Sequence, residues 1–302
     1  MKNHITALTL LCMMQVQCPA TVHAQDQPTP DERAKQDNIY RSKGADVPRG
    51  YVIGRALAAY TSALPTAFEQ DLTGLTATGR WLDIGAGEGQ AILDYYGPAS
   101  APAAAHTNQA NQANKAQSIA ISIEDRRTPR WHQTAAELEA GKIRYHFGKS
   151  LNDYTLQDLG QFDVITDLLG GFSYTRDIAK FMEKTLSLLH VDGSFYSLLQ
   201  DVQAETGANL PFYRDRGETY LTEIISADKT PVKVCTWLKH ISCVEVSCEL
   251  RPDWKPPVEI YRVRKSCDRV NVPALTPTRY TAGTPPERRY QYTAPETVEN
   301  TQ

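Results

Sequence analysis

One short segment, residues 83–89, limits what this chain can fold into more than any other feature. It reads Asp-Ile-Gly-Ala-Gly-Glu-Gly, follows an apolar run at 81–84 that is typical of a buried strand, and precedes a helical pattern at 90–96. Glycines let the backbone turn tightly and approach a ligand closely, and the start of a helix offers unpaired N–H donors. The segment therefore predicts an α/β domain with a ligand site at this turn.

The glycine spacing differs from that of the dinucleotide-binding fingerprint. After Gly85 and Gly87, that fingerprint places its third glycine at position 90, where this chain has Gln90. The segment does not match that fingerprint, and its position between a strand and a helix is what favours a ligand site here.

Segments with strand and helix patterns alternate along most of the chain. We expect strands at 81–84, 119–123, 143–147, 162–166, 194–199, 243–250 and 258–263, and helices at 90–96, 134–140, 178–189 and 231–241. This alternation predicts an α/β fold with a doubly wound, mainly parallel sheet. No helix separates the last two strands, which predicts an antiparallel hairpin at one edge of the sheet.

The first 24 residues have the pattern of a secretory signal peptide. Lys2 is followed by an apolar run at 5–16, and small or compact residues at 22–24 precede the expected cleavage point. The apolar run is too short to span a bilayer comfortably. We therefore expect a periplasmic or secreted protein with no membrane span after cleavage, the alternative being an uncleaved segment or a misassigned start codon.

Composition divides the rest of the chain into three parts, one of which contains an insertion. Residues 25–78 are expected to form a polar leader and N-terminal helices, and 79–267 the main domain. An alanine-rich, low-complexity insertion is expected at 97–118 within that domain. Residues 268–302 are rich in Thr and Pro with few aliphatic side chains, which predicts a disordered tail.

Four of the six cysteines remain after the expected cleavage, all in the last quarter of the chain. An even number in an exported protein predicts two disulfides with three possible connectivities, the alternative being four reduced thiols packed as small apolar groups. A hairpin centred near residue 255 would place Cys243 opposite Cys267, which leaves Cys235 to reach Cys248. No Cys-x-x-Cys pair occurs, so no metal centre is expected.

Charge argues against one class of partner. The formal net charge is −3, so a dominant basic surface for nucleic acid is not expected. A Gly-x-Ser-x-Gly nucleophile elbow, which would indicate a hydrolase of the α/β class, is also absent from the sequence.

The loop residues Asp83, Gly85, Gly87 and Gly89 resemble the first motif of the class I S-adenosylmethionine-dependent methyltransferases. The resemblance extends over residues 79–265 as a strand order, and it implies a Rossmann-like fold with S-adenosyl-L-methionine as cofactor. In that family the glycine loop lies against the methionine part of the cofactor.

The resemblance also implies roles for two carboxylates that follow strands. Glu124 stands where the family holds the ribose hydroxyls, although a carboxylate there can simply be a solvated strand end. Asp167 stands at the strand end that faces the transferred methyl group, where it would orient a nucleophile or accept its proton. The alternative for Asp167 is a helix cap or loop carboxylate.

These observations favour an exported methyltransferase whose substrate, a small molecule or a protein, the sequence does not identify. One alternative is a non-catalytic exported binding protein that retains the fold, because the cofactor is made in the cytoplasm and fold does not imply function. Another is an aminopropyl transferase on the same fold.

Overall fold

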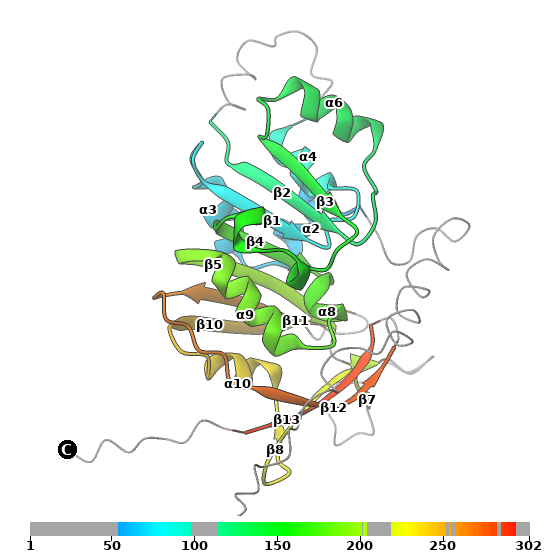
Figure 1. Cartoon of the computed structure of the whole chain (residues 1–302), viewed down its shortest axis with the longest axis vertical. Helices are drawn as coiled ribbons and strands as arrows, with labels where there is room; N and C mark the ends of the chain where they lie inside the picture. Colours follow the sequence, from blue (N-terminus) through cyan, green and yellow to red (C-terminus); the bar gives the residue numbers. More distant parts are fainter. Residues whose placement is uncertain are drawn as a thin grey trace, which may run out of the picture.

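The main sheet of the molecule has seven strands. The computed structural model describes residues 54–97, 114–200, 202–203, 219–251, 254, 258–282 and 285–293. The strands are β1 (Arg80–Ile84), β2 (Gln117–Ser122), β3 (Ile143–Phe147), β4 (Phe162–Leu168), β5 (Leu189–Gln200), β10 (Val244–Arg251) and β11 (Val258–Lys265), in the order β10-β11-β5-β4-β1-β2-β3. The first five run parallel, and β11 is antiparallel to both β5 and β10. The predicted Rossmann-like, doubly wound and mainly parallel sheet with its C-terminal antiparallel hairpin is confirmed (Figure 1).

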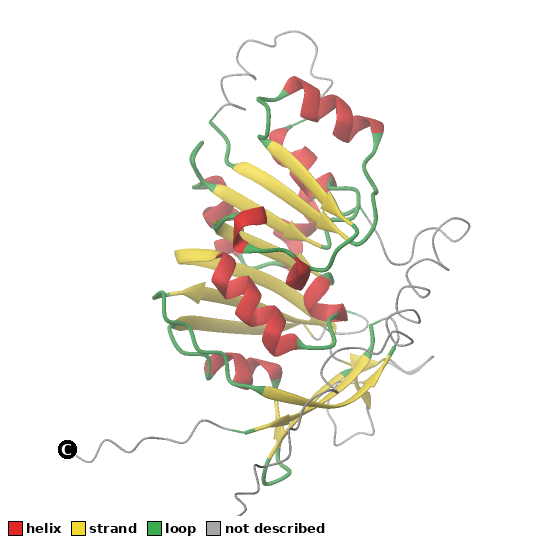
Figure 2. Cartoon of the chain, in the orientation of Figure 1, coloured by secondary structure: helices red, strands yellow, loops and turns green. Residues whose placement is uncertain are grey.

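Helices cover both faces of this sheet (Figure 2). One set comprises α2 (Leu57–Ala63), α3 (Thr66–Thr73), α4 (Gln90–Tyr96) and α6 (Pro129–Glu137), and the other α7 (Leu156–Leu159), α8 (Gly171–Tyr174), α9 (Ile178–Leu188) and α10 (Val234–Lys239), with a 3₁₀ turn at Leu151–Asp153. Neighbouring strand residues belong to different cores, because side chains alternate across a strand. Trp81 packs with the first set of helices and Leu82 with the second.

A second, smaller sheet lies at the lower end of the molecule in Figure 1. Its strands at 275–281 and 287–292 correct, for these residues, the expectation of a disordered tail at 268–302. Its strands are β12 (Leu275–Thr281), β13 (Glu287–Tyr292), β8 (Thr222–Ser226) and β9 (Pro231–Val232), in the order β12-β13-β8-β9; β6 (Val202–Gln203) pairs with β7 (Thr219–Tyr220) separately. Arg288, Tyr290 and Tyr292 alternate with half-buried residues and are themselves buried. The buried side chains of β13 are aromatic and polar, so the scarcity of aliphatic residues in this segment does not indicate disorder.

Other expectations fall outside the described residues or need shifted boundaries. The signal peptide at 1–24, the leader up to residue 53 and most of the insertion, 98–113, lie outside them. Strand β2 begins at Gln117, inside the range expected for the insertion. Helix α6 begins five residues before the expected 134–140, because Thr128 caps it and Pro129 occupies its first position.

Both predicted disulfides are present. Cys235 on α10 is bonded to Cys248 on β10, with 6.1 Å between the Cα atoms. Cys243 and Cys267, just beyond the paired ends of β10 and β11, are bonded with 5.1 Å between their Cα atoms. The two bridges fasten the edge hairpin to itself and to its covering helix, and they are compatible with an oxidising compartment.

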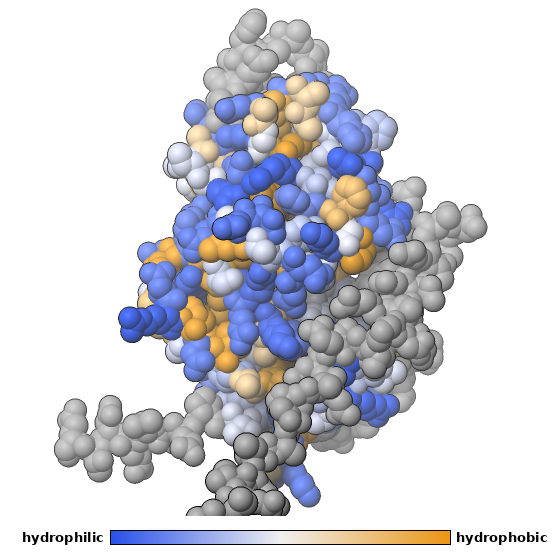
Figure 3. All heavy atoms as spheres, in the orientation of Figure 1, coloured by the Kyte–Doolittle hydropathy of each residue, from blue (hydrophilic) through white to orange (hydrophobic). Residues whose placement is uncertain are grey.

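The hydrophobicity of the helices and of the surface is relevant to contact with a membrane. Among the described helices, none has the length and apolar character needed to cross a bilayer. The face drawn in Figure 3 is mostly hydrophilic and carries separate hydrophobic patches.

Candidate functional site

The glycine loop lies at the carboxyl ends of three neighbouring parallel strands, β1, β2 and β4. Gly85, Gly87 and Gly89 have φ angles of 72°, 57° and 72°, a left-handed conformation that costs other residues energy. In open α/β sheets, ligands bind outside the carboxyl ends of the strands. The predicted loop residues are therefore together, in the backbone conformation and at the sheet edge that a ligand site requires.

Two of these glycines also touch other elements too closely for a side chain. A Cβ on Gly89 would lie 2.4 Å from the Trp131 ring on α6. A Cβ on Gly85 would lie 2.6 Å from the Cα of Gly170, which follows β4. The loop is thus wedged between α6 and the segment after β4, which holds its shape.

Asp83, the first residue of the motif, is fully buried beneath the loop. The Tyr60 hydroxyl on α2 donates to its two oxygens at 3.0 and 2.9 Å, and the Thr166 hydroxyl donates to Oδ1 at 2.8 Å. Trp81 Nε1 in turn donates to the Thr166 hydroxyl at 2.9 Å. This network connects α2, β1 and β4 through one carboxyl group.

Burial has a clear electrostatic effect on this carboxyl group. It raises the pKa of Asp83 to about 7, against the opposing influence of the Thr166 and Tyr60 hydroxyls and the charge of Arg55. Burial also raises the pKa of the Tyr60 phenol well above its usual value, so the phenol stays protonated and remains a donor.

Glu124 lies beside the glycine loop, as the sequence predicts, and Tyr145 on β3 connects the two. The Tyr145 hydroxyl is 2.5 Å from the Gly87 carbonyl oxygen and 3.2 Å from that of Glu124. The Glu124 carboxylate is ion-paired with Arg126 at 2.5 Å and remains 28% exposed. The Glu124 side chain is therefore partly accessible to a ligand. A ligand that bonds to this carboxylate would share it with the Arg126 guanidinium.

Asp167 is at the end of β4, opposite Ile84, and is fully buried. Its Oδ1 accepts a hydrogen bond from the Gly170 N–H at 2.8 Å, and its Oδ2 accepts one from the Phe172 N–H at 2.9 Å. Burial raises its pKa to about 7 despite these two donors. This geometry is that of a loop-holding carboxylate, the alternative considered from the sequence.

Arg55 is a charged residue near the glycine loop that no sequence pattern indicates. It follows Gly54, whose Cβ position would lie 3.1 Å from Glu88 Oε2 in the glycine loop. Burial is the main influence on the pKa of Asp83 and Asp167, and the charge of Arg55 acts on both in the opposite direction, lowering the pKa. Within the described part of the chain, this half-buried cation has no hydrogen-bond or ion-pair partner. A lone arginine at 55 gave no signal, because only the fold brings it to the loop.

Exposed apolar side chains continue the site toward β3. Ile123 directly follows β2 and is 37% exposed, and Phe147 is the last residue of β3 and is 45% exposed. The Arg127 guanidinium lies 5.3 Å from the Phe147 ring centre and is paired with Asp125 at 2.7 Å. An apolar surface bordered by charge at this edge suits a flat, partly polar ring such as a nucleobase.

Among the described residues, one group has the atoms of a metal site: Cys235, Cys248 and Glu259, within 4.8 Å of one another. The two sulfur atoms are joined in a disulfide, so they do not offer thiolates.

The structure of this chain is similar to solved structures of other proteins, whereas its sequence matches no family model and no curated protein. The chain is similar to the solved structure of an rRNA methylase from Streptococcus thermophilus, with 10% identity over 67% of this chain and 95% of that one and a TM-score of 0.39. It is also similar to the N-methyltransferase NodS from Bradyrhizobium japonicum in complex with S-adenosyl-L-homocysteine, with 12% identity over 76% of this chain and 98% of that one and a TM-score of 0.42. A putative S-adenosylmethionine-dependent methyltransferase from Listeria monocytogenes is 14% identical over 67% of this chain and all of that one, with a TM-score of 0.39. At such values the likeness assigns no role to any residue of this chain.

Proposed function

We propose that this chain is an exported methyltransferase that binds S-adenosyl-L-methionine at the glycine loop. The observation that carries the proposal is the left-handed backbone of Gly85, Gly87 and Gly89 at the carboxyl end of β1, beside an accessible carboxylate, Glu124. A ligand with a ribose, a flat base and a zwitterionic tail finds a suitable group for each part along this edge.

The chain's own residues fit these parts of the cofactor. Glu124 accepts hydrogen bonds from the ribose hydroxyls, and its ion pair with Arg126 holds the carboxylate beside the loop. Ile123 and Phe147 offer an apolar surface for the adenine. The unpartnered cation of Arg55 meets the carboxylate of the methionine tail.

Catalysis in this proposal depends on alignment and on shielding from water. The bound cofactor supplies a methyl group activated by its sulfonium charge. The glycine loop and the Gly170 segment hold the reacting end in place, which is the contribution that positioning makes to a displacement. Asp167, with a pKa raised to about 7, stands at this end as a carboxyl group that holds or takes up a proton near neutral pH.

Export of the protein rests on two independent features. The first is the signal-peptide pattern at 1–24, and the second is the pair of disulfides Cys235–Cys248 and Cys243–Cys267. We propose a periplasmic or secreted location, with a small molecule or a protein as substrate and no nucleic acid as partner.

Calorimetry of the purified protein with S-adenosylmethionine and S-adenosylhomocysteine tests the proposal. We expect binding of both, and a loss of at least tenfold in affinity for Gly87→Arg, because its side chain and left-handed backbone disturb the loop. Gly141→Arg is the matched control: it has a similar φ of 82° and open space at its Cβ, at the turn before β3.

The outcomes separate the function hypotheses. A folded protein that gives no heat with either ligand would favour the alternative of a non-catalytic exported binding protein that retains the fold. Tighter binding of decarboxylated S-adenosylmethionine than of the intact cofactor would favour an aminopropyl transferase. Equal binding by wild type and Gly87→Arg would remove the loop as the site.

A further inference from the structure

Helix α8 is held at both ends by buried polar side chains, a carboxyl group at its start and a guanidinium at its end. At its start, Asp167 accepts hydrogen bonds from the N–H groups of Gly170 and Phe172. At its end, Arg288 Nη1 donates to the carbonyl oxygens of Phe172 at 2.8 Å and Thr175 at 2.9 Å. A carboxylate at the start and a cation at the end are the groups that the helix dipole favours.

Arg288 belongs to the small C-terminal sheet and is only 1% exposed. Its Nε and Nη2 donate to the Thr222 hydroxyl at 3.2 and 2.7 Å, and its backbone N–H donates to Leu221 at 2.7 Å. Among the residues that the structure describes, no carboxylate is in ion-pair distance of this guanidinium. Its charge is therefore compensated by carbonyl and hydroxyl oxygens, whose loss would leave a buried cation unsolvated.

The segment that Arg288 holds is the one that closes against the glycine loop. A Cβ on Gly170 would lie 2.5 Å from the Ile84 carbonyl oxygen and 3.1 Å from the Cα of Gly85. Gly171 is equally confined, with its Cβ position 2.8 Å from the Phe181 ring on α9. A displacement of α8 would therefore move the wall of the candidate site.

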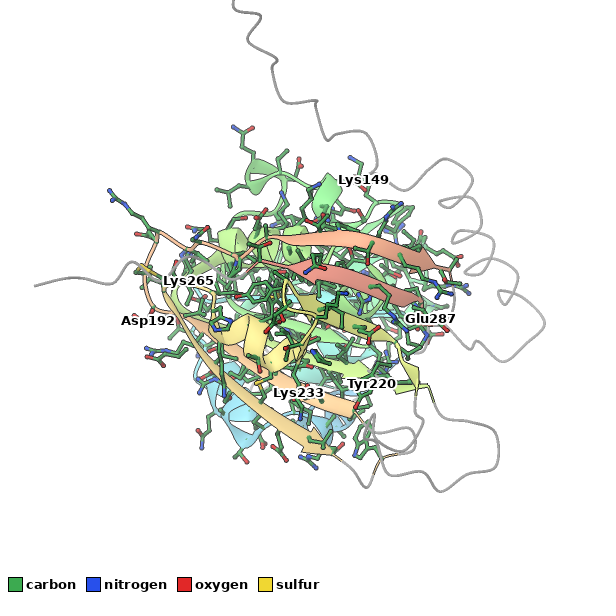
Figure 4. The ribbon with its side chains drawn as sticks, turned by 90° about the horizontal axis from the view of Figure 1, so that it is seen from below. Lys149, Asp192, Tyr220, Lys233, Lys265 and Glu287 are labelled. Carbon is green, nitrogen blue, oxygen red and sulfur yellow. A yellow bond between two sulfur atoms is a disulfide. The ribbon has the colours of Figure 1, made fainter. Side chains whose placement is uncertain are left out.

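The strand that carries Arg288 reaches this place from the far end of the chain. Figure 4, seen from below, shows the C-terminal strands crossing this end of the molecule. Glu287, the first residue of β13, and Tyr220, the last residue of β7, lie on the same side of this view. The register of β13 with β8 pairs Arg288 with Thr222. Strand pairing thus fixes the backbone position of Arg288 independently of its contacts with α8.

We propose that Arg288 is a positioning residue: through α8 it fixes Gly170 and Asp167 against the glycine loop, which makes the C-terminal sheet part of the ligand site. The positioning itself is a property of the chain alone. Only its consequence for ligand binding rests on the proposed function.

Hydrogen exchange of the ligand-free, full-length protein tests the positioning. Arg288→Met is expected to raise exchange of the amides at 170–175 by about tenfold or more, while β1, β2 and β3 keep wild-type protection. Arg288→Lys restores part of that protection, since an ammonium still donates to the carbonyls. Arg279→Met on β12, exposed and in the same sheet, is the matched control and stays at wild-type exchange. Unchanged exchange at 170–175 in Arg288→Met would overturn the proposal.

Calorimetry with S-adenosylhomocysteine tests the consequence. We expect affinity to fall by about tenfold or more in Arg288→Met, a smaller loss in Arg288→Lys and none in Arg279→Met. If Arg288→Met does not fold, Thr222→Val removes the hydroxyl that anchors the guanidinium and is measured in the same way. Wild-type affinity in a variant whose 170–175 amides exchange faster would refute the role in binding. If the wild type binds no S-adenosylhomocysteine, the proposed function fails while the exchange data still decide the positioning.

Discussion

Gly85 and Gly170 meet backbone to backbone, so that neither position has space for a side chain. A Cβ on Gly85 would lie 2.6 Å from the Cα of Gly170, and a Cβ on Gly170 would lie 3.1 Å from the Cα of Gly85. This contact joins the loop after β1 to the segment after β4. It sets the width of the candidate site between the two strands.

Gly85→Ala is therefore expected to cost about 2–4 kcal/mol of unfolding free energy, the sum of left-handed strain and of overpacking against backbone. Gly141→Ala, with a similar φ but nothing within 4 Å of its Cβ position, is expected to cost only about 1 kcal/mol. Urea unfolding of the two variants and the wild type measures the difference. Equal losses would show that the contact between the two glycines is not tight.

Arg55→Ala is expected to weaken S-adenosylhomocysteine binding by about 10- to 100-fold, the equivalent of one charge-assisted hydrogen-bonding contact. 5′-Methylthioadenosine has no carboxylate, so its affinity is expected to stay the same. Calorimetry with both ligands on the wild type, Arg55→Ala and the exposed control Arg279→Ala measures this. A parallel loss for both ligands in Arg55→Ala would mean that Arg55 supports the fold and does not bind the carboxylate.

Local patterns were sufficient to predict the centre of the sheet. Helix α4 occupies the expected residues 90–96, and β3 the expected 143–147, because apolar spacing, Pro98 and the glycine turn all act over a few residues. The sequence left three disulfide connectivities open, and the one that follows from a hairpin centred near residue 255 is the one present.

The rest depends on contacts between distant parts of the chain. Tyr60 and Asp83 are 23 residues apart, and Arg288 and Phe172 are 116 apart, and no local pattern connects them. The alternation around Arg288 was visible in the sequence, but an arginine on the inward face of a Thr- and Pro-rich segment does not look like core. Glu124 was predicted by position, whereas its pairing with Arg126 required the folded loop.

The buried carboxyl group of Asp83 makes stability depend on pH. Its pKa is raised by burial to about 7, against about 3.9 in an unfolded chain, so the folded state binds more protons between those values. This contribution to stability is complete below pH 4 and is lost as the pH rises through 7, at up to about 1.4 kcal/mol per pH unit. Asp167 adds a dependence of the same sign.

Asp83→Asn is therefore expected to reduce the fall in unfolding free energy between pH 5 and pH 7 by about half, because Asp167 still titrates. Urea unfolding at pH 5, 6 and 7 measures it, with the exposed Asp268→Asn as a control that keeps the wild-type slope. A slope in Asp83→Asn equal to that of the wild type would contradict the raised pKa.

The two disulfides are expected to hold the sheet edge with about 3 kcal/mol each, because they close loops of 13 and 24 residues in the unfolded chain. The double variants Cys235→Ser/Cys248→Ser and Cys243→Ser/Cys267→Ser are expected to lose roughly that amount in urea unfolding. Intact-mass measurement of protein collected after export, with and without reductant, should differ by four hydrogen atoms, and peptide mapping should join each named pair. Four free thiols would contradict both the pairing and the export that it supports.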